Sequence, residues 1–479
     1  MDEPSAARRY DVVVIGAGPT GENVAQYAVQ GGLSAVIVES ELIGGECSYW
    51  ACMPSKALLR PPAALAAARE VAGSREAVTG GLDVAAVLAR RDGFTSGWDD
   101  EGQASWLADT GIDLVRGRGR LTGEKTVSVR QGDDTAVTLA AEHAVVICTG
   151  SDAAVPPIPG LREARPWTSR EVTSAKDVPG RLVVVGGGVV GCEMTDAFDA
   201  LGSAVTMVVR GDRLLPGVEP FAGDLVADAL RERGVDIRLG ASAEHVERRP
   251  DGTVVVATDT GAVVAADEVL VAAGRRPRTE DIGLGAVGLT DGAWLDVDDT
   301  CLVRGVAGEW LYAAGDLNHR ALLTHMGKYQ ARACGAAIAA RARGRQVGDR
   351  PWSRYVATAD HLAVPQVVFT RPEVAAVGLS YRQAQDAGMD ARAVDFPIGS
   401  VAGASLHADG YTGQARVVVD ERRHVVVGAT FAGPDVADLL HAATVAVVGE
   451  VPIERLWHAV PAYPTISEVW LRLLETYST

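Results

Sequence analysis

The first apolar run of the chain begins a pattern that is typical of a nucleotide-binding unit. Residues 10–15 (YDVVVI) are mostly apolar and end at a glycine, which predicts a buried parallel strand. A glycine-rich loop follows, and then a stretch to Gln30 that we predict to be helical. Residues 35–38 form a second apolar run that ends at Glu39. The predicted order is therefore strand, glycine loop, helix, strand and terminal acid.

The same order returns near the middle of the chain. Residues 181–185 (RLVVV) predict a strand, and residues 186–191 (GGGVVG) form a second glycine-rich loop. A predicted helix to Leu201 and a predicted strand at residues 205–209 complete the copy. Two copies of one unit imply that the chain binds two nucleotides, or that it binds one nucleotide pair across an interface.

Shorter elements lie between the two copies. The alanine-rich residues 62–71 predict a helix, which we expect to begin near Pro62. Residues 126–129 and 137–140 alternate in polarity, as short strands do. A further apolar run at residues 145–150 (VVICTG) closes the first part of the chain.

The last part of the chain is set off by two predicted linkers. Residues 151–161 are rich in proline, and residues 341–353 follow a predicted helix at residues 329–340. Beyond the second linker, strand-like runs alternate with a helix, which predicts a separate α+β unit. Its predicted strands are residues 366–369, 415–419 and 425–430, and its predicted helix is residues 434–448.

Composition narrows the class of protein. The chain has 479 residues, 47% hydrophobic and 22% charged, which is typical of a globular protein with several domains. The 45 basic and 62 acidic residues sum to a net charge of −17, which argues against nucleic-acid binding. The N-terminus shows no signal-peptide pattern, and no run of about 18 apolar residues occurs. We therefore expect no membrane association and a cytoplasmic location.

The glycines of the first loop suit a dinucleotide. Gly16 permits a tight turn, Gly18 lets the backbone approach a pyrophosphate, and Gly21 allows the helix to pack closely. The N-terminus of the following helix offers free N–H groups to the phosphates. Glu39 is spaced to accept hydrogen bonds from ribose hydroxyls.

The second loop differs from the first at the end of its second strand. Gly186, Gly188 and Gly191 repeat the glycine spacing, but the strand runs into Arg210, with Arg213 close behind. An acid there would suit a free 2′-hydroxyl, whereas an arginine suits a 2′-phosphate. The sequence therefore favours NADPH over NADH, with NADH still possible.

Two of the six cysteines are five residues apart. Cys47 and Cys52 have no cluster of further Cys or His with ligand spacing, so structural zinc is not expected. Within one and a half helical turns the two side chains can meet in a strained, reducible bridge, and Lys56 stands close by. The other cysteines lie far apart, and we predict that they are single buried thiols: Cys148, Cys192, Cys301 and Cys334.

The segment GGECSYWACMPSK around these cysteines resembles the redox-active segment of the class I pyridine nucleotide–disulfide oxidoreductases. That family includes dihydrolipoamide dehydrogenase, glutathione reductase and mercuric reductase. Further resemblances follow in family order: Thr149 and Gly150 in ICTG, Gly274 and Arg275 in AGRRP, and Asp316 in YAAGD. Together the matches cover about residues 10–468, nearly the whole chain.

The resemblance implies a fold and a division of the chain. It implies an α/β fold with two Rossmann-like dinucleotide-binding domains and a C-terminal α+β dimerisation domain. The expected parts are an FAD-binding domain in two segments, 1–155 and 276–345, an NAD(P)-binding domain at 156–275 and an interface domain at 350–479.

The resemblance also implies the cofactors, FAD and NADPH, and a reaction path. Hydride from NADPH would reach the flavin, and the flavin would reduce a Cys47–Cys52 disulfide. Cys52 would face the flavin, Cys47 would attack a small-molecule acceptor, and Lys56 and Glu193 would form an ion pair beside the flavin. The residues expected to contact the cofactors are Gly16, Gly18, Pro19, Gly21, Glu39, Gly45, Lys56, Gly119, Thr149, Gly150, Asp316, Thr324, Gly186, Gly188, Gly191, Arg210, Arg213, Gly274 and Arg275.

The sequence departs from the family at its C-terminal motif. Family members end in HxHPTxSE, where the second histidine is the acid/base and the glutamate holds it. Here that histidine is Tyr463, and Glu468 is the matching acid. Tyrosine is a poor base at neutral pH because its reference pKa is about 10. His458 lies five residues upstream, and we expect it to end a helix at the surface.

Two hypotheses about the acceptor stay open. In the first, the enzyme is an NAD(P)H-dependent reductase of a small or bacillithiol-like disulfide, or acts like dihydrolipoamide dehydrogenase. In the second, it reduces a quinone, another electrophile or a metal ion, and the cysteine pair is a relay or a relic. Mercury reduction is doubtful because the chain ends in WLRLLETYST, without the C-terminal cysteine pair of mercuric reductases. In both hypotheses we expect a homodimer, because in the family the C-terminal tail completes the partner's site.

Overall fold

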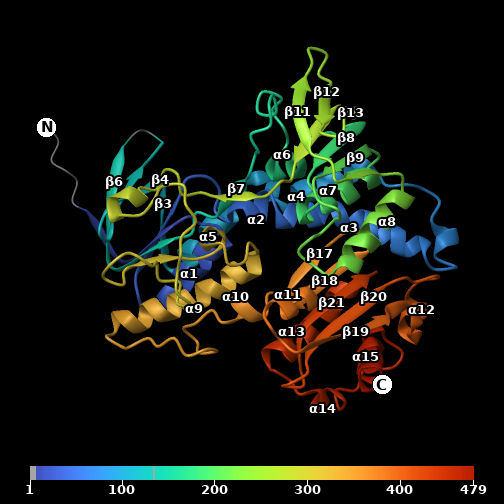
Figure 1. Cartoon of the computed structure of the whole chain (residues 1–479). Coiled ribbons are helices and arrows are strands. Elements are labelled where there is room, and N and C mark those ends of the chain that lie inside the picture. The colour runs from blue at the N-terminus through green and yellow to red at the C-terminus, as the bar shows by residue number, and fades with distance from the viewer. Residues whose placement is uncertain (1–6, 133–134) are drawn as a thin grey trace. The chain divides into compact units, whose positions relative to one another are not determined.

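The computed structural model describes residues 7–132 and 135–479 (Figure 1). Its contacts divide the chain into two compact units. The first unit comprises residues 1–53, 92–152 and 275–361, and the second comprises residues 54–91, 153–274 and 362–479. Each unit is built on its own sheets and its own hydrophobic core.

The first unit is built on a mostly parallel sheet. Strands β3, β2, β1 and β6 lie side by side and parallel, and β16 pairs with the C-terminal half of β6. Strands β5 and β4 continue from the N-terminal half of β6 as an antiparallel extension. The strands are β1 (Arg8–Ile15), β2 (Ala35–Glu39), β3 (Ile112–Arg116), β4 (Arg118–Gly123), β5 (Thr126–Arg130), β6 (Ala136–Ile147) and β16 (Leu311–Ala313).

Both faces of this sheet are buried. Val13 and Ile15 of β1 point into one apolar cluster, whereas Val12 and Val14 point into another. A strand buried on both faces needs a continuous apolar run, which is the pattern that residues 10–15 show. The helices are α1 (Pro19–Gln30), α2 (Gly45–Tyr49), α5 (Glu101–Thr110), α9 (Thr324–Ala342) and α10 (Ala359–Leu362).

Helices α1 and α9 lie against each other in the first unit (Figure 1). A Cβ at Gly335 of α9 would stand 2.6 Å from the Cβ of Tyr27, and one at Gly31, just after α1, would stand 2.5 Å from the Cβ of Ala339. Small residues therefore let the two helices approach closely, and this packing holds the N-terminus of α1 at the end of β1.

The second unit contains a parallel sheet in the order β10-β9-β8-β14, a three-stranded antiparallel sheet and a five-stranded antiparallel sheet. Its nucleotide-binding part consists of α6 (Ser169–Ser174), β8 (Arg181–Val185), α7 (Val189–Ala200), β9 (Ala204–Val209), α8 (Pro220–Glu232), β10 (Asp236–Leu239), β11 (Ala243–Arg248), β12 (Val254–Thr258), β13 (Val263–Ala266) and β14 (Glu268–Val271). Helix α3 (Cys52–Arg69) leads the chain into this unit. Helix α4 (Val84–Phe94) leads it back to the first unit.

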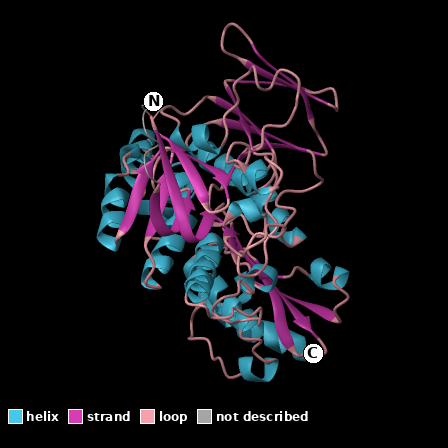
Figure 2. Cartoon of the chain, turned by 90° about the vertical axis from the view of Figure 1, so that its left-hand side faces the viewer, coloured by secondary structure: helices cyan, strands magenta, loops and turns pink. Residues whose placement is uncertain are grey.

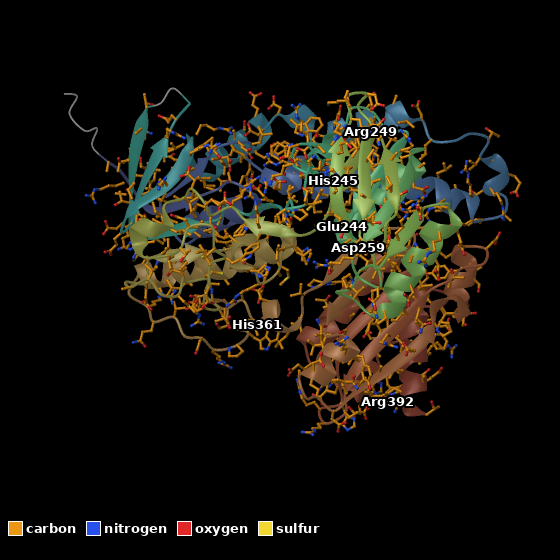
Figure 3. The ribbon with its side chains drawn as sticks, turned by 45° about the horizontal axis from the view of Figure 1, so that its top comes forward. Glu244, His245, Arg249, Asp259, His361 and Arg392 are labelled. Atoms are coloured by element: carbon orange, nitrogen blue, oxygen red, sulfur yellow. The ribbon has the colours of Figure 1, made fainter. Side chains whose placement is uncertain are left out.

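The small antiparallel sheet of this unit has an edge strand, β11, that is largely exposed. Glu244 and His245 of β11 are exposed, as is Arg249 just beyond the strand (Figure 3), whereas the next residue after His245, Val246, is buried. Asp259 follows β12 and is also exposed (Figure 3).

The C-terminal part of the second unit is the five-stranded sheet, in the order β17-β18-β21-β20-β19. Helices α13 and α15 pack against its strands, and Figure 2 shows strands and helices together near the C-terminus. The elements are β17 (Gln366–Val368), β18 (Glu373–Gly378), α11 (Tyr381–Asp386), β19 (Ala391–Pro397), α12 (Ala402–His407), β20 (Gln414–Asp420), β21 (Val425–Gly433), α13 (Leu440–Val448), α14 (Ile453–Leu456) and α15 (Val469–Ser478).

Several predicted elements differ from those observed. The helix expected at residues 62–71 is α3, which begins ten residues earlier and runs through Pro61 and Pro62. The runs at 137–140 and 145–150 belong largely to one strand, β6, because it bridges an antiparallel and a parallel neighbour.

Two further segments also differ from the prediction. The helix expected at residues 434–448 begins as a 3₁₀ turn at Val436, and α13 starts only at Leu440. The linker at residues 151–161 opens with a short strand, β7 (Ser151–Ala153), which pairs with β15 (Arg275–Pro277).

Candidate functional site

The first glycine loop forms a tight cradle at the end of β1. Gly16 has a φ of +103°, and a Cβ there would stand 2.5 Å from the carbonyl oxygen of Cys148. A Cβ at Gly21 would stand 1.9 Å from the carbonyl oxygen of Gly16, whereas one at Gly18 would meet nothing within 4 Å. The outer glycines are therefore required by packing, and the middle one faces open space.

The N-terminus of α1 leaves backbone donors for a ligand. No side chain caps this end, and Pro19 occupies the first turn. The carboxylate of Glu39 accepts hydrogen bonds from the N–H groups of Ala17 and Glu41, both at 2.7 Å. These bonds hold Glu39 at the loop, where its remaining lone pairs are available to hydroxyl donors.

The second glycine loop repeats this geometry at the end of β8. Gly186 has a φ of +125°, and a Cβ there would stand 2.3 Å from the carbonyl oxygen of Ala272. A Cβ at Gly191 would stand 2.4 Å from the carbonyl oxygen of Gly186, and one at Gly188 would meet nothing within 4 Å. The N-terminus of α7 again lacks a side-chain cap.

The residues after β9 carry positive charge. Arg210 is exposed and has no ion-pair partner in residues 7–132 and 135–479. Arg213 is held by Asp212, with nitrogen-to-oxygen distances of 3.2 and 3.3 Å. Of the two arginines, Arg210 is therefore the freer to meet a phosphate.

Cys47 and Cys52 lie on two consecutive helices rather than on one. Cys47 is in α2, and the backbone leaves helical geometry at Trp50 before Cys52 opens α3. The single-helix geometry that we expected for the pair was therefore wrong. The two cysteines are not joined by a disulfide, and the Sγ of Cys52 lies 3.3 Å from the hydroxyl of Thr324 at the start of α9.

The two thiols are close enough to share a proton. The hydrogen bond that Cys47 donates to Cys52, together with burial, raises the pKa of Cys47, whereas the hydroxyl of Thr324 and the charge of Lys328 act to lower it. Because one thiol stabilises the other by hydrogen bonding, the pair suits a state in which a single thiol is ionised.

The partly exposed Lys56 forms an ion pair with the buried Glu193 in the second unit. The Lys56 Nζ lies 3.1 and 2.8 Å from the two carboxylate oxygens of Glu193, whose side chain is 4% exposed. The N–H of Phe369 donates to the same carboxylate at 3.0 Å, and the Lys56 Nζ lies 5.0 Å from the Phe369 ring centroid. Three hydrogen bonds thus offset the cost of burying this charge.

Asp316 is positioned by polar contacts at the end of β16. Its carboxylate accepts a hydrogen bond from the Ser151 hydroxyl at 2.5 Å and lies 3.7 Å from the Arg275 Nε. Arg275 also donates to the hydroxyl of Ser151 at 2.6 Å. Ser151 therefore links Asp316 and Arg275, which belong to separate sequence motifs.

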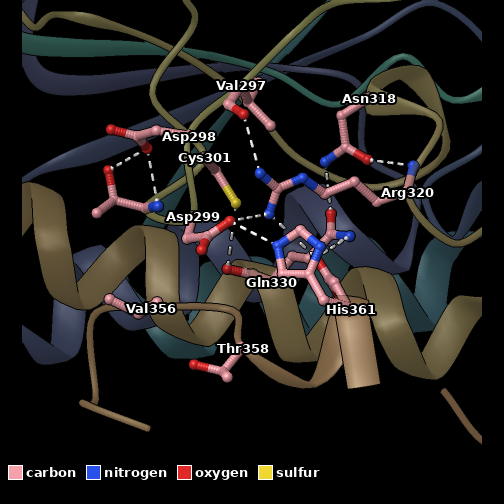
Figure 4. A network of polar contacts seen from close by, with 12 residues as sticks. Val297, Asp298, Asp299, Cys301, Asn318, Arg320, Gln330, Val356, Thr358 and His361 are labelled. Atoms are coloured by element: carbon pink, nitrogen blue, oxygen red, sulfur yellow. Dashed lines mark hydrogen bonds and ion pairs between the residues drawn. The ribbon is translucent and has the colours of Figure 1, made fainter. Parts of the chain in front are cut away.

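A buried amide supports the turn that carries Asp316. The side-chain oxygen of Gln330 on α9 accepts hydrogen bonds from the Gly315 N–H and from the Asn318 amide, both at 2.8 Å (Figure 4). The Gln330 amide donates to Asp360 at 2.9 Å. Arg320 and His361 share the carboxylate of Asp299 close by, at 2.8 Å each (Figure 4).

Five other predicted contact residues lie at turns or in close packing. The Thr149 hydroxyl donates to the Arg278 carbonyl at 2.8 Å, and the Gly150 carbonyl accepts from the Arg278 N–H. A Cβ at Gly45 would stand 2.9 Å from the Cα of Gly18, and one at Gly119 would stand 3.1 Å from Ile15. Gly274 has a φ of +129° and open space around it.

The structure does not bring Tyr463 and Glu468 together by any hydrogen bond within the described residues. Tyr463 is 75% exposed, whereas Glu468 is buried and accepts a hydrogen bond from Arg472 at 2.6 Å. The other carboxylate oxygen of Glu468 is buried with no hydrogen-bond partner in the described part of the chain. His458 is exposed just after α14.

The remaining four cysteines are buried, but they are not all isolated. Cys148, Cys301 and Cys334 pack in the same apolar cluster under α1 and α9, and Cys192 lies in another. The expectation of buried thiols outside any disulfide is confirmed for all four, and three of them lie in one cluster because β6, the segment before β16 and α9 converge from distant parts of the sequence. Burial raises the pKa of Cys148, so this thiol is unreactive.

Comparison with known proteins decides the family. Residues 10–340 match the family model of the pyridine nucleotide-disulphide oxidoreductases, and residues 364–473 match the dimerisation domain of that family. The chain belongs to the pyridine nucleotide-disulphide oxidoreductase family. It is therefore an FAD-dependent enzyme that uses NAD(P)H, and the predicted family and α/β fold class are confirmed. The dimerisation domain supports a homodimer.

The relatives of this oxidoreductase have different enzymatic activities. It is 30% identical to a mercuric reductase from Staphylococcus aureus, over 96% of this chain and 81% of the relative. It is 33% identical to a dihydrolipoyl dehydrogenase from Pseudomonas aeruginosa, over 95% of each chain. Its fold matches the HOCl-induced flavoprotein disulfide reductase RclA from Escherichia coli with a TM-score of 0.83 and 24% identity, over 98% of this chain and 99% of that one.

The residues of the oxidoreductase fit the cofactors that its family uses. The open space at Gly18 and the uncapped α1 N-terminus suit the pyrophosphate of FAD, and the same features at Gly188 and α7 suit that of NAD(P)H. Among the described residues, no group of three or more His, Cys, Asp and Glu side chains is placed to hold a metal ion. Of the helices in those residues, none has the length and hydropathy needed to cross a bilayer.

Sequence reasoning missed several residues that support the site. Ser151 and Gln330 position the Asp316 turn, and Lys328 influences Cys47, although none of the three belongs to a quoted motif. A signal for Lys328 was available, because lysine is scarce in this chain and a lysine in a flavoprotein site is informative. Nothing in the local sequence marks Ser151 or Gln330.

Proposed function

We propose that this oxidoreductase uses NADPH to reduce a Cys47–Cys52 disulfide, which then reduces a small-molecule acceptor. The observation that carries the proposal is the cysteine pair itself: two hydrogen-bonded thiols on consecutive helices, with Thr324 beside them. Oxidation of this dithiol to a disulfide releases two electrons and two protons, which is the stoichiometry that two-electron acceptors require. Bound FAD supplies the two-electron carrier between the nucleotide and the cysteines.

Each cysteine has a separate part in the proposal. Cys52 opens α3, where the N-terminus of a helix favours a thiolate, and its Sγ contacts Thr324. We assign it the flavin-facing position. Cys47 is the nucleophile toward the acceptor; its hydrogen bond to Cys52 and its burial raise its pKa, and the charge of Lys328 opposes that rise.

Lys56 and Glu193 are proposed as the ion pair that stands beside the flavin, as the family resemblance implies. The carboxylate fixes the direction of the ammonium group, because it accepts two contacts from Lys56 and one from the Phe369 backbone. The proposed FAD contacts are the first loop, Glu39, Thr324 and the Asp316 turn. The proposed NADPH contacts are the second loop and Arg210, with Arg213 secondary because Asp212 holds it.

Tyr463 and Glu468 are proposed to complete the site of the partner subunit in a homodimer. The exposure of Tyr463 suits a residue that serves another chain, and its phenol can deliver a proton or donate a hydrogen bond.

The proposal is tested with purified FAD-loaded enzyme, NADPH and a panel of acceptors under anaerobic conditions. We expect Cys47→Ser and Cys52→Ser each to abolish reduction of small disulfides, while Cys192→Ala, which changes a fully buried thiol, retains it. Reduction of disulfides by either active-site variant at the wild-type rate would refute the proposal.

A second candidate function is reduction of a quinone, another electrophile or a metal ion as substrate. The replacement of the usual histidine by Tyr463 favours it, because a thiol-exchange reaction loses its expected acid/base. The 30% identity to a mercuric reductase also supports a metal-ion substrate, whereas the 33% identity to a dihydrolipoyl dehydrogenase supports a dithiol substrate. If Cys47→Ser leaves quinone reduction unchanged and no disulfide is ever turned over, this second function replaces the first.

A further inference from the structure

A cavity of about 260 Å³ lies in the first unit, where the C-terminal ends of α1 and α9 meet the segment that follows α9. Its polar lining is Tyr27, Gln30, Arg343, Arg345, Arg354 and Tyr355. The rest of the lining is glycine and alanine, and no acidic side chain takes part. Every one of these polar groups can donate hydrogen bonds, and the three guanidinium groups can do nothing else. The cavity therefore suits a ligand that is rich in acceptors and negatively charged.

The two helices that form the cavity run parallel and end at the same place. Near the end of α1, Tyr27 lies against Gly335 of α9, and one turn further on Gly31 lies against Ala339. Each helix C-terminus carries about half a negative charge, so the two ends offset about one of the three guanidinium charges. Stabilisation of the helix ends therefore accounts for about one arginine, and about two positive charges remain in the cavity.

Carboxylates do not neutralise the cavity arginines within residues 7–132 and 135–479. The guanidinium of Arg343 donates to the Gly31 carbonyl, and that of Arg354 lies 5.5 Å from the ring centroid of Tyr355. The side chain of Arg345 forms no hydrogen bond or ion pair in that part of the chain. Two of the three guanidinium groups are thus held in place while most of their N–H groups stay available, which lowers the cost of ordering them around a ligand.

Arg341, in the last turn of α9, shows how a structural arginine of the same stretch behaves. Its guanidinium donates to the hydroxyls of Thr300 and Tyr312 at 3.1 and 3.0 Å and lies 3.9 Å from the carboxylate of Glu309. The protein itself therefore satisfies this side chain. The cavity arginines have no comparable partners among the described residues, so packing alone does not explain their charge.

The cavity is separate from the two dinucleotide loops. Helix α1 has 12 residues and spans about 18 Å at 1.5 Å per residue, and its glycine loop lies at the opposite end from the cavity. No residue of either glycine loop lines the cavity. A ligand bound here is therefore additional to FAD and NAD(P)H, and the inference goes beyond the proposed function without depending on the electron acceptor.

We infer that this cavity binds a diphosphate group, either as inorganic pyrophosphate or as the end of a nucleoside diphosphate. A diphosphate presents acceptor oxygens in several directions at both of its ends, whereas a carboxylate presents two in one plane. The donors of the cavity come from α1, from α9 and from the segment after α9, so they surround a compact anion rather than face one plane. The volume is slightly below that of pockets for drug-sized ligands, which is roughly 300–1,000 Å³, so a nucleoside attached to the diphosphate would extend into solvent.

Isothermal titration calorimetry of the FAD-loaded enzyme with pyrophosphate tests the site. The titration is made without divalent cations and with saturating NAD⁺ and NADP⁺, so that the second glycine loop is occupied. Pyrophosphate is expected to bind once per chain. Its Kd should be at least about tenfold lower than that of orthophosphate or citrate, which is the worth of one charge-assisted hydrogen bond. Citrate controls for charge alone, because it brings three carboxylates and no phosphate.

Two charge-neutralising variants locate the site in the cavity. Arg345→Gln and Arg354→Gln should each raise Kd for pyrophosphate by about tenfold. Arg332→Gln is the matched control, because Arg332 is an exposed arginine of α9 that lies outside the cavity, 5.3 Å from the ring centroid of Tyr329. Both cavity side chains are exposed and neither pairs with a carboxylate in the described residues, so the variants should unfold at the wild-type temperature when no ligand is present.

ADP distinguishes the two sources of the diphosphate group. If ADP binds at least as tightly as pyrophosphate and loses the same affinity in Arg354→Gln, the ligand is a nucleoside diphosphate. If ADP binds more weakly than pyrophosphate, the ligand is the free anion. Both results support a diphosphate site in this cavity.

Three results would overturn the inference. The first is a wild-type enzyme that takes up no pyrophosphate at millimolar concentration. The second is citrate that binds as tightly as pyrophosphate, since charge alone would then explain the affinity. The third is an equal rise in Kd for Arg332→Gln and for the cavity variants, which would show that the anion responds to the positive charge of α9 as a whole.

Discussion

The two glycine loops of this oxidoreductase share one backbone design and differ in their side chains, notably at two positions. In both, the first glycine backs onto a neighbouring carbonyl, the third backs onto the first, and the middle one faces open space. At the end of the second strand, however, the first unit has Glu39, whereas the second unit has Val209 followed by Arg210. Directly after the third glycine, the first unit has Glu22 and the second has Cys192. The shared backbone therefore selects dinucleotides as a class, and the variable positions distinguish the ligands.

The residue directly after the third glycine has different surroundings in the two loops. Cys192 is fully buried, contacts the Gly187 carbonyl with its Sγ and has a pKa raised by burial, so it stays a neutral core residue. Glu22 faces a cavity with a carboxyl oxygen that has no partner among the described residues. The first loop can thus contribute to ligand recognition beyond its dinucleotide, and the second cannot.

The largest expected effect comes from adding one methyl group to each third glycine. The added Cβ would stand 1.9 Å from a carbonyl oxygen in Gly21→Ala and 2.4 Å from one in Gly191→Ala, so the helix must move away from its strand. We expect Gly21→Ala to be purified with little FAD. Gly191→Ala should retain FAD and raise KM for NADPH by about 100-fold, which corresponds to about 2.7 kcal/mol.

Flavin absorbance per protein and steady-state kinetics measure these two effects. Gly93→Ala is the control, because a Cβ there meets nothing within 4 Å. If Gly21→Ala keeps a full complement of flavin, the first loop is not the FAD cradle.

A smaller effect is expected at the strand end of the second unit. Arg210→Gln removes a guanidinium group that has no ion-pair partner in the described part of the chain, so KM for NADPH should rise about tenfold while KM for NADH stays unchanged. Arg213→Gln should have a weaker effect, because Asp212 already engages that side chain. Equal or better kcat/KM with NADH in the wild-type enzyme would contradict the assignment of Arg210.

The third expected effect is a pH dependence of stability at Glu22. Burial raises the pKa of Glu22 from 4.5 to about 7, so the folded enzyme binds more protons than the unfolded chain between these values. Its contribution to stability is therefore lost as pH rises through this window. Glu22→Gln should be close to wild type at pH 4.5 and more stable by about 1–3 kcal/mol at pH 7.5.

Thermal unfolding of both proteins at several pH values measures this difference. Cys192→Ser should show no matching trend below pH 8, because its buried thiol stays protonated in both states over that range. A stability difference for Glu22→Gln that does not change with pH would show that Glu22 has an ordinary pKa.

The backbone of the two loops could be predicted from sequence because it depends on local chemistry. Apolar runs set β1, β2, β8 and β9 to within about two residues, and glycine spacing sets the turns. Helix α3 was harder, because Pro61 and Pro62 within it looked like a start rather than an interior. Tertiary packing of its apolar face overrides the local cost of proline there.

The candidate site was predictable only where its residues are close in sequence. Cys47, Cys52 and Lys56 fall within ten residues, and a resemblance was enough to find them. Gln330 supports Gly315 from a helix, and Lys328 lies about 280 residues after Cys47, whose pKa it affects. Such contacts arise only when α9 docks beside α1, and no local pattern encodes them.

The most direct test of the proposed function counts thiols before and after reduction by NADPH. Anaerobic FAD-loaded enzyme, oxidised beforehand, is treated with excess NADPH, freed of nucleotide, denatured and titrated with a thiol reagent. The proposal predicts four thiols in the oxidised enzyme and six after NADPH, out of the six cysteines of the chain, and no gain in Cys52→Ser. If NADPH reduces the enzyme and the thiol count does not change, the Cys47–Cys52 pair is not on the electron path.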